Sequence, residues 1–197
     1  MNYKALVYDY KNLLNFNALK LSDINMTKKV TLVELKKHLR KKEHNELVEE
    51  IADLYKKFTV VKEYYQASFF NDDEAVLKKY KSIIDTEFLG GARSLPKMRL
   101  SVARKAVTDY KKVSCSDTGL ADIMLYYVEA GIDCSNTYGN PYEQFYISVD
   151  RMFESAIKLI HEKELLNQFE TRIKAVVHNS VDSGYGFDDL LEELYEI

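Results

Sequence analysis

The chain has 197 residues, of which 46% are hydrophobic and 30% are charged, and its formal net charge is −3 at pH 7. This balance is typical of a folded globular protein and argues against a disordered one. The small negative charge provides no global basic field to attract nucleic acid or an anionic membrane. Two cysteines, Cys115 and Cys134, are too few for a disulfide framework and have no metal-binding motif around them. We therefore expect free thiols, no metal site and no cofactor.

Residues 1–25 are predicted to be an extension of the domain that follows. Met26 directly precedes the first strong helical pattern and is a candidate start, so we expect residues 1–25 to be removable without unfolding the rest. Lys4, Asp9 and Lys11 interrupt the apolar sequence of this segment, which argues against a signal peptide. No stretch of the chain is apolar for long enough to span a membrane. We expect a cytoplasmic protein with no membrane partner.

The rest of the chain is predicted to be helical, because only seven glycines and two prolines interrupt it. Thr31 and Glu34 form a T-x-x-E capping box at the start of the first helix. From there, apolar residues recur at spacings of three and four, which is the helical period. The predicted helical segments, in chain order, carry Leu32, Leu35 and Leu39; Leu47, Ile51, Leu54 and Phe58; Val60, Val61, Tyr64 and Tyr65; an acidic start at 71–74 and a stop at Gly90–Gly91; Leu100, Ala103, Val107 and Tyr110; Leu120, Ile123, Met124, Tyr127 and Val128; Phe145, Val149, Met152, Phe153, Ile157 and Ile160; Leu165, Leu166, Phe169, Ile173, Val176 and Val177; and Phe187, Leu190, Leu191 and Leu194.

These segments predict an all-α fold of about eight or nine helices, with residues 26–197 forming a single domain. A compact helical bundle and a short helical array both fit the pattern. Pro96 is predicted to open the helix that carries Leu100, and Gly131 to end the helix that begins at Asp117. Pro141 is predicted to lie in the first turn of the next helix.

Tyrosines and carboxylates gather between residues 126 and 146, and such side chains can orient a polar ligand in a groove. The alternative, which we favour, is that each hydroxyl satisfies a buried partner in a tyrosine-rich core. A glycine loop near the C-terminus adds one more tyrosine, for which a tight structural turn is the preferred interpretation. The ligand-binding candidates are Arg99, Tyr127, Glu129, Tyr138, Glu143, Tyr146 and Tyr185.

The segment 99–112 is the most basic predicted helix. Arg99 aligns with the apolar side of this helix, so we expect it to be largely buried and paired with a carboxylate, first Glu129 and second Glu143. The other basic residues lie on the outer flank, where their charges are expected to remain in solvent. Residues 28–42 are also basic, but the glutamates that follow dilute their field, which favours a solvated face of mixed charge. The outer stripe consists of Lys97, Arg104, Lys105 and Lys111.

From about Lys28 to the C-terminus, the chain resembles an uncharacterised bacterial family of helical proteins, domain of unknown function 6155. The stretches that carry the resemblance are "ELVEEIADLYKKF", "RLSVARKAV", "ADIMLYYVE", "YGNPYEQFY" and "GYGFDDLLEELY". The first 25 residues lie outside it. The resemblance implies no activity, no cofactor and no catalytic residue.

The leading functional interpretation is a non-enzymatic binding or interaction module that takes a protein partner or associates with itself. An enzyme with a Tyr/Glu/Arg-lined pocket built around residues 126–146 is the alternative, with Glu129 or Glu143 as general acid or base. A nucleic-acid-binding accessory protein is the third and less favoured interpretation. An exposed apolar patch would favour the interaction module. A closed pocket with a glutamate beside a tyrosine hydroxyl would favour the enzyme. A continuous basic face would favour the nucleic-acid-binding protein.

Overall fold

The computed structural model describes residues 29–70, 72–91, 94–139 and 142–180. These residues form eight α-helices and no strand, and 82% of them are helical, so the predicted all-α fold is confirmed. The chain divides into two compact units, residues 1–52 and 53–197. That residues 26–197 behave as a single domain remains a prediction, and residues 1–25 lie outside the described part of the chain.

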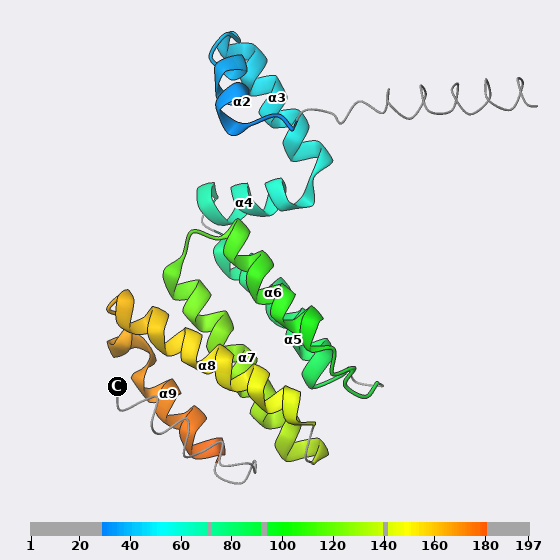
Figure 1. Cartoon of the computed structure of the whole chain (residues 1–197), viewed down its shortest axis with the longest axis vertical. Helices are drawn as coiled ribbons and strands as arrows, with labels where there is room; N and C mark the ends of the chain where they lie inside the picture. Colours follow the sequence, from blue (N-terminus) through cyan, green and yellow to red (C-terminus); the bar gives the residue numbers. More distant parts are fainter. Residues whose placement is uncertain (1–28, 71, 92–93, 140–141, 181–197) are drawn as a thin grey trace, which may run out of the picture. The chain divides into compact units, whose positions relative to one another are not determined.

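The first unit contains a helical hairpin of α2 (Leu32–Leu39) and the start of α3 (His44–Lys57) (Figure 1). The predicted capping box is confirmed at the start of α2. The Thr31 hydroxyl accepts a hydrogen bond from the Glu34 amide at 3.3 Å, and the Thr31 amide donates to the Glu34 carboxylate at 2.9 Å. Between the helices, Lys42 Nζ lies 2.5 Å from Glu50 Oε2, which ties the connecting loop to α3.

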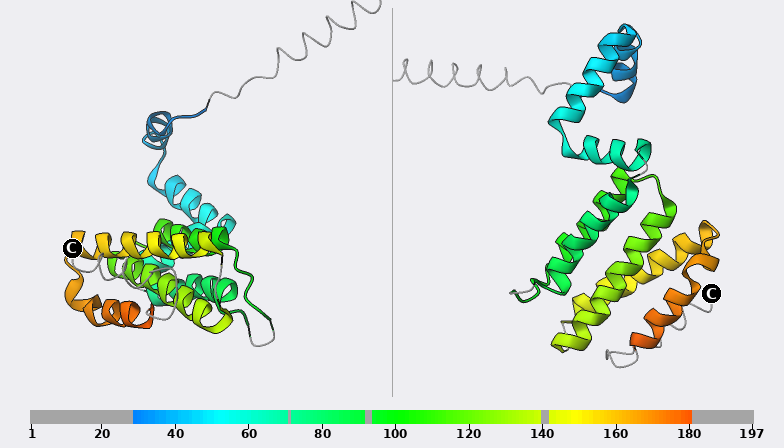
Figure 2. Two further views of the ribbon diagram at one scale, coloured as in Figure 1. Left: turned by 60° about the horizontal axis from the view of Figure 1, so that its bottom comes forward. Right: turned by 180° about the vertical axis from the view of Figure 1, so that it is seen from behind.

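The second unit contains the remaining six described helices. They are α4 (Thr59–Phe69), α5 (Asp73–Phe88), α6 (Leu100–Val113), α7 (Asp117–Tyr138), α8 (Glu143–Glu162) and α9 (Leu166–Ser180). The longest helix, α7, is the central one, because α5, α6, α8 and α9 all pack against it (Figure 2). The amphipathic pattern of each helix explains this arrangement, since each apolar stripe is removed from water against a neighbour.

The core of the second unit is built from aromatic and aliphatic side chains of α5 to α9. Phe88 of α5 lies at its centre, with ring centroids 4.8 Å from Tyr127 of α7 and 5.2 Å from Phe145 of α8. All three side chains are at most 1% exposed. Tilted and edge-to-face aromatic pairs of this kind contribute about 0.5–1.5 kcal/mol each beyond the burial of apolar area. The contact joins α5 to the consecutive helices α7 and α8.

Two predicted helix boundaries are wrong, while the start of α7 at Asp117 and the stop of α5 at Gly90–Gly91 are confirmed. Helix α7 does not end at Gly131, which is buried inside the helix, where a Cβ atom would lie 2.7 Å from a methyl group of Val149. Glycine there permits the close approach of α7 and α8 and does not end the helix. Helix α6 begins at Leu100 and not directly after Pro96. The stop at Gly90–Gly91 is confirmed, since α5 ends at Phe88 and Gly90 has φ of +76°.

Candidate functional site

Helices α2 and α3 each carry an apolar stripe, and neither helix has a buried residue. On α2, Leu32 is 64% exposed and Leu35 is 43% exposed. On α3, the exposed apolar residues recur at spacings of three and four, as a helical stripe requires. We call these exposed residues together the α2–α3 apolar face. It consists of Leu32, Leu35, Val48 and Ile51, which all belong to the first unit and are all at least 43% exposed.

Charged residues accompany this apolar face and are segregated by sign. Residues 29–42 contain six lysines and arginines and one acid, whereas residues 43–53 contain five acids and no lysine or arginine. On α2, Lys36 and then Arg40 follow Leu32 at spacings of four, so they flank the α2 stripe. On α3, Glu46 and Glu50 flank the stripe on the side of Leu47 and Leu54. The hairpin is therefore basic along its first helix and acidic along its second.

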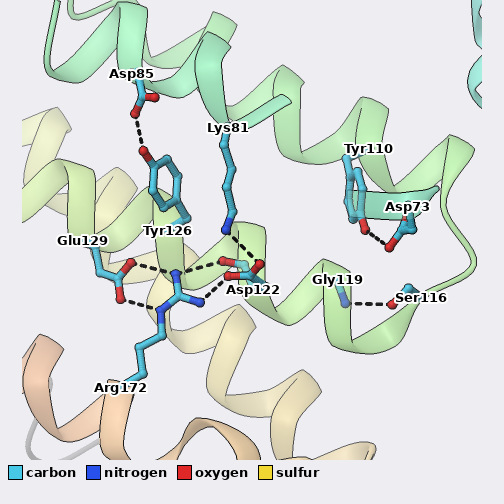
Figure 3. Close-up of polar contacts among 10 residues, drawn as sticks. All are labelled: Asp73, Lys81, Asp85, Tyr110, Ser116, Gly119, Asp122, Tyr126, Glu129 and Arg172. Carbon is cyan, nitrogen blue, oxygen red and sulfur yellow. Dashed lines mark hydrogen bonds and ion pairs between the residues drawn. The ribbon is translucent and has the colours of Figure 1, made fainter. Parts of the chain in front are cut away.

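The second unit contains a polar network centred on Arg172 of α9 (Figure 3). The Arg172 guanidinium donates to both carboxylate oxygens of Glu129, at 2.5 and 2.7 Å, and also to the Asp122 carboxylate. Lys81 of α5 donates to the second oxygen of Asp122 at 2.8 Å. Burial acts to raise the pKa of the Asp122 carboxyl, but the hydrogen bonds from Lys81 and Arg172 outweigh it and lower this pKa. The network joins α5, α7 and α9.

A cavity of about 260 Å³ lies beside this network. Tyr126, Glu129 and Asp133 of α7 provide its polar wall, together with Asn179 of α9. The Tyr126 hydroxyl donates to Asp85 at 2.5 Å, and burial together with this hydrogen bond raises the pKa of Tyr126. Burial and the neighbouring Glu129 raise the pKa of Asp133. The apolar wall consists of Leu89, Ala130, Ile132, Ala175 and Val176.

The prediction for Arg99 is right about the kind of partner but wrong about burial and about the partner itself. Its side chain is 54% exposed, and its guanidinium donates to Glu87 at 3.0 and 2.6 Å. The reason is the later start of α6, which places Arg99 at the N-cap and not on the apolar side of the helix. Glu87 is 1% exposed, and the hydrogen bond from Arg99 lowers its pKa against the effect of burial.

The other predicted ligand-binding residues do not converge on one site. Tyr127 shares a buried hydrogen bond with Ser148 at 2.7 Å, and Tyr146 shares one with Ser135 at 3.0 Å. Tyr138 donates to the Leu89 carbonyl at 3.2 Å, and Glu143 is exposed in the first turn of α8. Of the candidates from residues 127–146, only Glu129 lines the cavity. Tyr185 lies outside the described residues.

The basic stripe is exposed along its length and is partly neutralised by an acid on its own helix. Lys97, Arg104, Lys105 and Lys111 are all exposed. Asp109 forms ion pairs with Lys105 and with Lys112, the latter at 2.7 Å, and the hydrogen bonds from these lysines lower the pKa of Asp109. This pairing reduces the field that α6 presents to a phosphate backbone.

The family model for a family of unknown function, DUF6155, matches residues 26–197. The chain belongs to this family. No curated protein and no solved structure matches it. The matched region contains every helix that the structure describes, the α2–α3 apolar face and the Arg172 network included, and it leaves out residues 1–25.

Three further observations concern the described residues alone. No group of three histidine, cysteine, aspartate or glutamate side chains among them could hold a metal ion. None of their helices is both long enough and apolar enough to cross a membrane. Both cysteines are free, Cys115 at the surface and Cys134 in the interior, where burial raises the pKa of the thiol to about 11.

Sequence reasoning missed Arg172, Asp122 and Lys81, although two of them carry a signal. Arg172 lies three residues after Phe169 and four before Val176, so it occupies a position on the apolar stripe of α9. Asp122 lies between Ala121 and Ile123, which are both buried. A charge inside an apolar stripe needs a partner of opposite sign. Spacing alone does not identify that partner, because it belongs to another helix.

Proposed function

We propose that the protein is a non-enzymatic interaction module that binds another protein chain through the α2–α3 apolar face. One observation carries the proposal: α2 and α3 are amphipathic helices without a single buried residue. An amphipathic helix derives most of its stability from packing its apolar stripe, because propensity alone is marginal at these lengths. A monomeric protein rarely exposes a contiguous apolar patch of this kind, and such patches mark interaction sites.

The polar network and its cavity support a structural role better than a catalytic one. Both oxygens of Glu129 accept hydrogen bonds from Arg172, and the Tyr126 hydroxyl donates to Asp85. A general acid or base must reach the proton that it transfers, and these groups are already engaged with each other. We infer that the network holds α5, α7 and α9 together. The enzyme interpretation therefore receives less support than the interaction module.

Site-specific photo-crosslinking in the full chain tests the proposal. A photoreactive amino acid replaces Ile51 on the apolar stripe, and in a matched control it replaces Glu49, which lies two residues earlier on the opposite side of α3. We expect intermolecular adducts, identified by mass spectrometry, from position 51 and few from position 49. Adducts confined to a single chain, or equal yields at the two positions, would contradict the proposal.

A further inference from the structure

We infer that the partner of the α2–α3 apolar face is a second copy of this chain, with two α2–α3 hairpins pairing about a two-fold axis into a four-helix bundle. This inference rests on the proposed function and names the partner that it requires. In such an isologous interface, the same surface of both copies takes part, and a contact of α2 with α3 of the other copy occurs twice. A surface that serves this purpose must be complementary to itself.

The charges that flank the apolar face have this self-complementarity. Lys36 and Arg40 form the basic flank of α2, and among the described residues neither has an acidic partner. Glu46 and Glu50 form the acidic flank of α3; Glu50 is already paired with Lys42 of its own chain, and Glu46 also accepts a hydrogen bond from the Glu43 amide. When α2 of one copy lies along α3 of the other, the basic flank of each copy meets the acidic flank of its partner. Such complementarity selects the partner and the register more than it adds affinity.

The apolar stripes provide the interior of the bundle. Four-helix bundles bury stripes that repeat every three or four residues, and the stripe of α3 continues at this spacing from Leu47 through Ile51 to Leu54. Leu32 and Leu35 contribute the corresponding residues of α2. Two hairpins together supply four stripes, which is the number that the architecture requires.

The extent of the family match favours a second copy over residues 1–25 as the occupant. The match covers residues 26–197, so it includes the apolar face and excludes the N-terminal segment. A segment that covers the α2–α3 apolar face and lies within the matched region accompanies the face in every chain that the family model matches in full. A second copy of the chain meets this condition, because it carries the face itself.

Sedimentation equilibrium of the full chain tests the inference first. We expect the mass to rise from 22.9 kDa toward twice this value as the concentration increases. Two apolar substitutions, Leu35→Glu with Ile51→Glu, are expected to keep the mass at that of one chain at every concentration. A wild-type chain that stays monomeric up to its solubility limit, or a dimer that survives these substitutions, overturns the inference.

Charge reversal with complementation is the sharper test. One variant carries Lys36→Glu and the other carries Glu46→Lys, so that the Lys42–Glu50 pair within each chain stays intact. Each alone is expected to dimerise at least about tenfold more weakly than the wild type, because like charges then face each other across the interface. An equimolar mixture is expected to recover the dimer as a heterodimer. Because a variant that had lost its helices would not be rescued, recovery separates pairing from misfolding.

The two proposals fail in different ways. If the wild type remains monomeric while position 51 crosslinks to a different protein, the second copy is excluded and the interaction module stands. If neither dimer nor intermolecular adduct forms, both fail. If both charge-reversal variants dimerise like the wild type, the face does not pair as inferred.

Discussion

Helices α3 and α6 each have 14 residues and each carries an apolar stripe, but their surroundings differ completely. α6 buries six residues, from Leu100 to Val113, whereas α3 buries none. Ile51 and Val107 occupy the same position, the eighth, in their respective helices, and they are 44% and 4% exposed. The difference lies outside the helices, since α6 packs against α4, α5 and α7 of its own unit, whereas no residue of α3 is buried. An amphipathic pattern therefore predicts that a helix will pack, but not against which neighbour.

Matched substitutions at these two positions test the comparison with the largest expected effect. Val107→Glu places an unpaired charge in the core and is expected to lower the free energy of unfolding by about 4 kcal/mol or more. Ile51→Glu is expected to change it by less than about 0.5 kcal/mol in the monomer, because the side chain stays in water. Thermal and urea unfolding of dilute protein, followed by circular dichroism, measure both. Similar losses from the two variants would show that Ile51 packs within the folded monomer.

Alanine substitutions at Arg172 and Arg104 compare the stability cost of losing an arginine in the polar network with that of losing an exposed one. Arg172→Ala is expected to cost about 2–3 kcal/mol, because it leaves Glu129 without its partner and Asp122 with Lys81 alone. The Arg172 side chain is 26% exposed, so the cost is below that of a fully buried pair. Arg104→Ala removes an exposed side chain and is expected to cost under about 1 kcal/mol.

The pH dependence of stability follows from the lowered pKa of Asp122. The stabilisation from its ion pairs is complete above the pKa of an unfolded aspartate and is lost as the pH falls through the lower folded pKa. We expect acid to destabilise the wild type more than Arg172→Ala over this range. Parallel curves of melting temperature against pH for the two proteins would mean that Arg172 does not contribute to the shift.

The effects of substituting Arg99 and Glu87 on thermal stability are expected to be coupled. Arg99→Ala should lower the melting temperature more than Arg104→Ala, because Glu87 is 1% exposed and loses its side-chain partner. Adding Glu87→Gln should recover part of the loss, since the buried group is then neutral. A double-mutant cycle of thermal unfolding measures this coupling, and simple additivity of the two effects would rule it out.

Asp150 of α8 is predicted to destabilise the fold at neutral pH. Burial raises the pKa of its carboxyl to about 6, and its Oδ1 atom is buried without a hydrogen-bond partner among the described residues. Because the folded pKa is above the unfolded value, stability falls as the pH rises through the window between them. Asp150→Asn is expected to add about 1 kcal/mol at pH 7 and to remove this dependence. Unfolding experiments on the two proteins from about pH 4 to pH 7 span this window and measure the difference.

The smallest effect is expected on the outer face of α6. Lys111→Ala should cost under about 1 kcal/mol, because the side chain is exposed and other charges surround it. We also expect DNA and RNA to bind weakly, since Asp109 neutralises part of the basic stripe. Titrations at several salt concentrations measure this. Tight binding that weakens steeply with salt, and further in a variant with both Arg104→Ala and Lys111→Ala, would instead favour the nucleic-acid interpretation.

The sequence by itself determined the helical fold, the stripes and the capping box at Thr31. These features depend on neighbours within about four positions, where periodicity and capping preferences act directly. The basic stripe is exposed as predicted, because the helical period places it away from the apolar stripe of α6. The end of α7 was missed because the usual role of glycine as a helix stop is local, whereas Gly131 accommodates Val149 of another helix. The sequence allowed Tyr127 and Tyr146 either to bind a ligand or to satisfy a buried partner in the core. Their hydrogen bonds to buried serines favour the second role.

Only the tertiary structure decided which charges meet. Arg99 lies 12 positions after its partner Glu87, and Arg172 lies 43 positions after Glu129. Electrostatic pairing depends on distance in space, and the later start of α6, at Leu100 and not directly after Pro96, moved Arg99 from the predicted apolar side to the helix cap. The tertiary structure also showed that the stripe of α6 is buried and that of α3 is exposed, although the two stripes look alike in the sequence. Burial is a property of a side chain together with its surroundings, so it is decided by what the rest of the chain, or a second chain, brings to each helix.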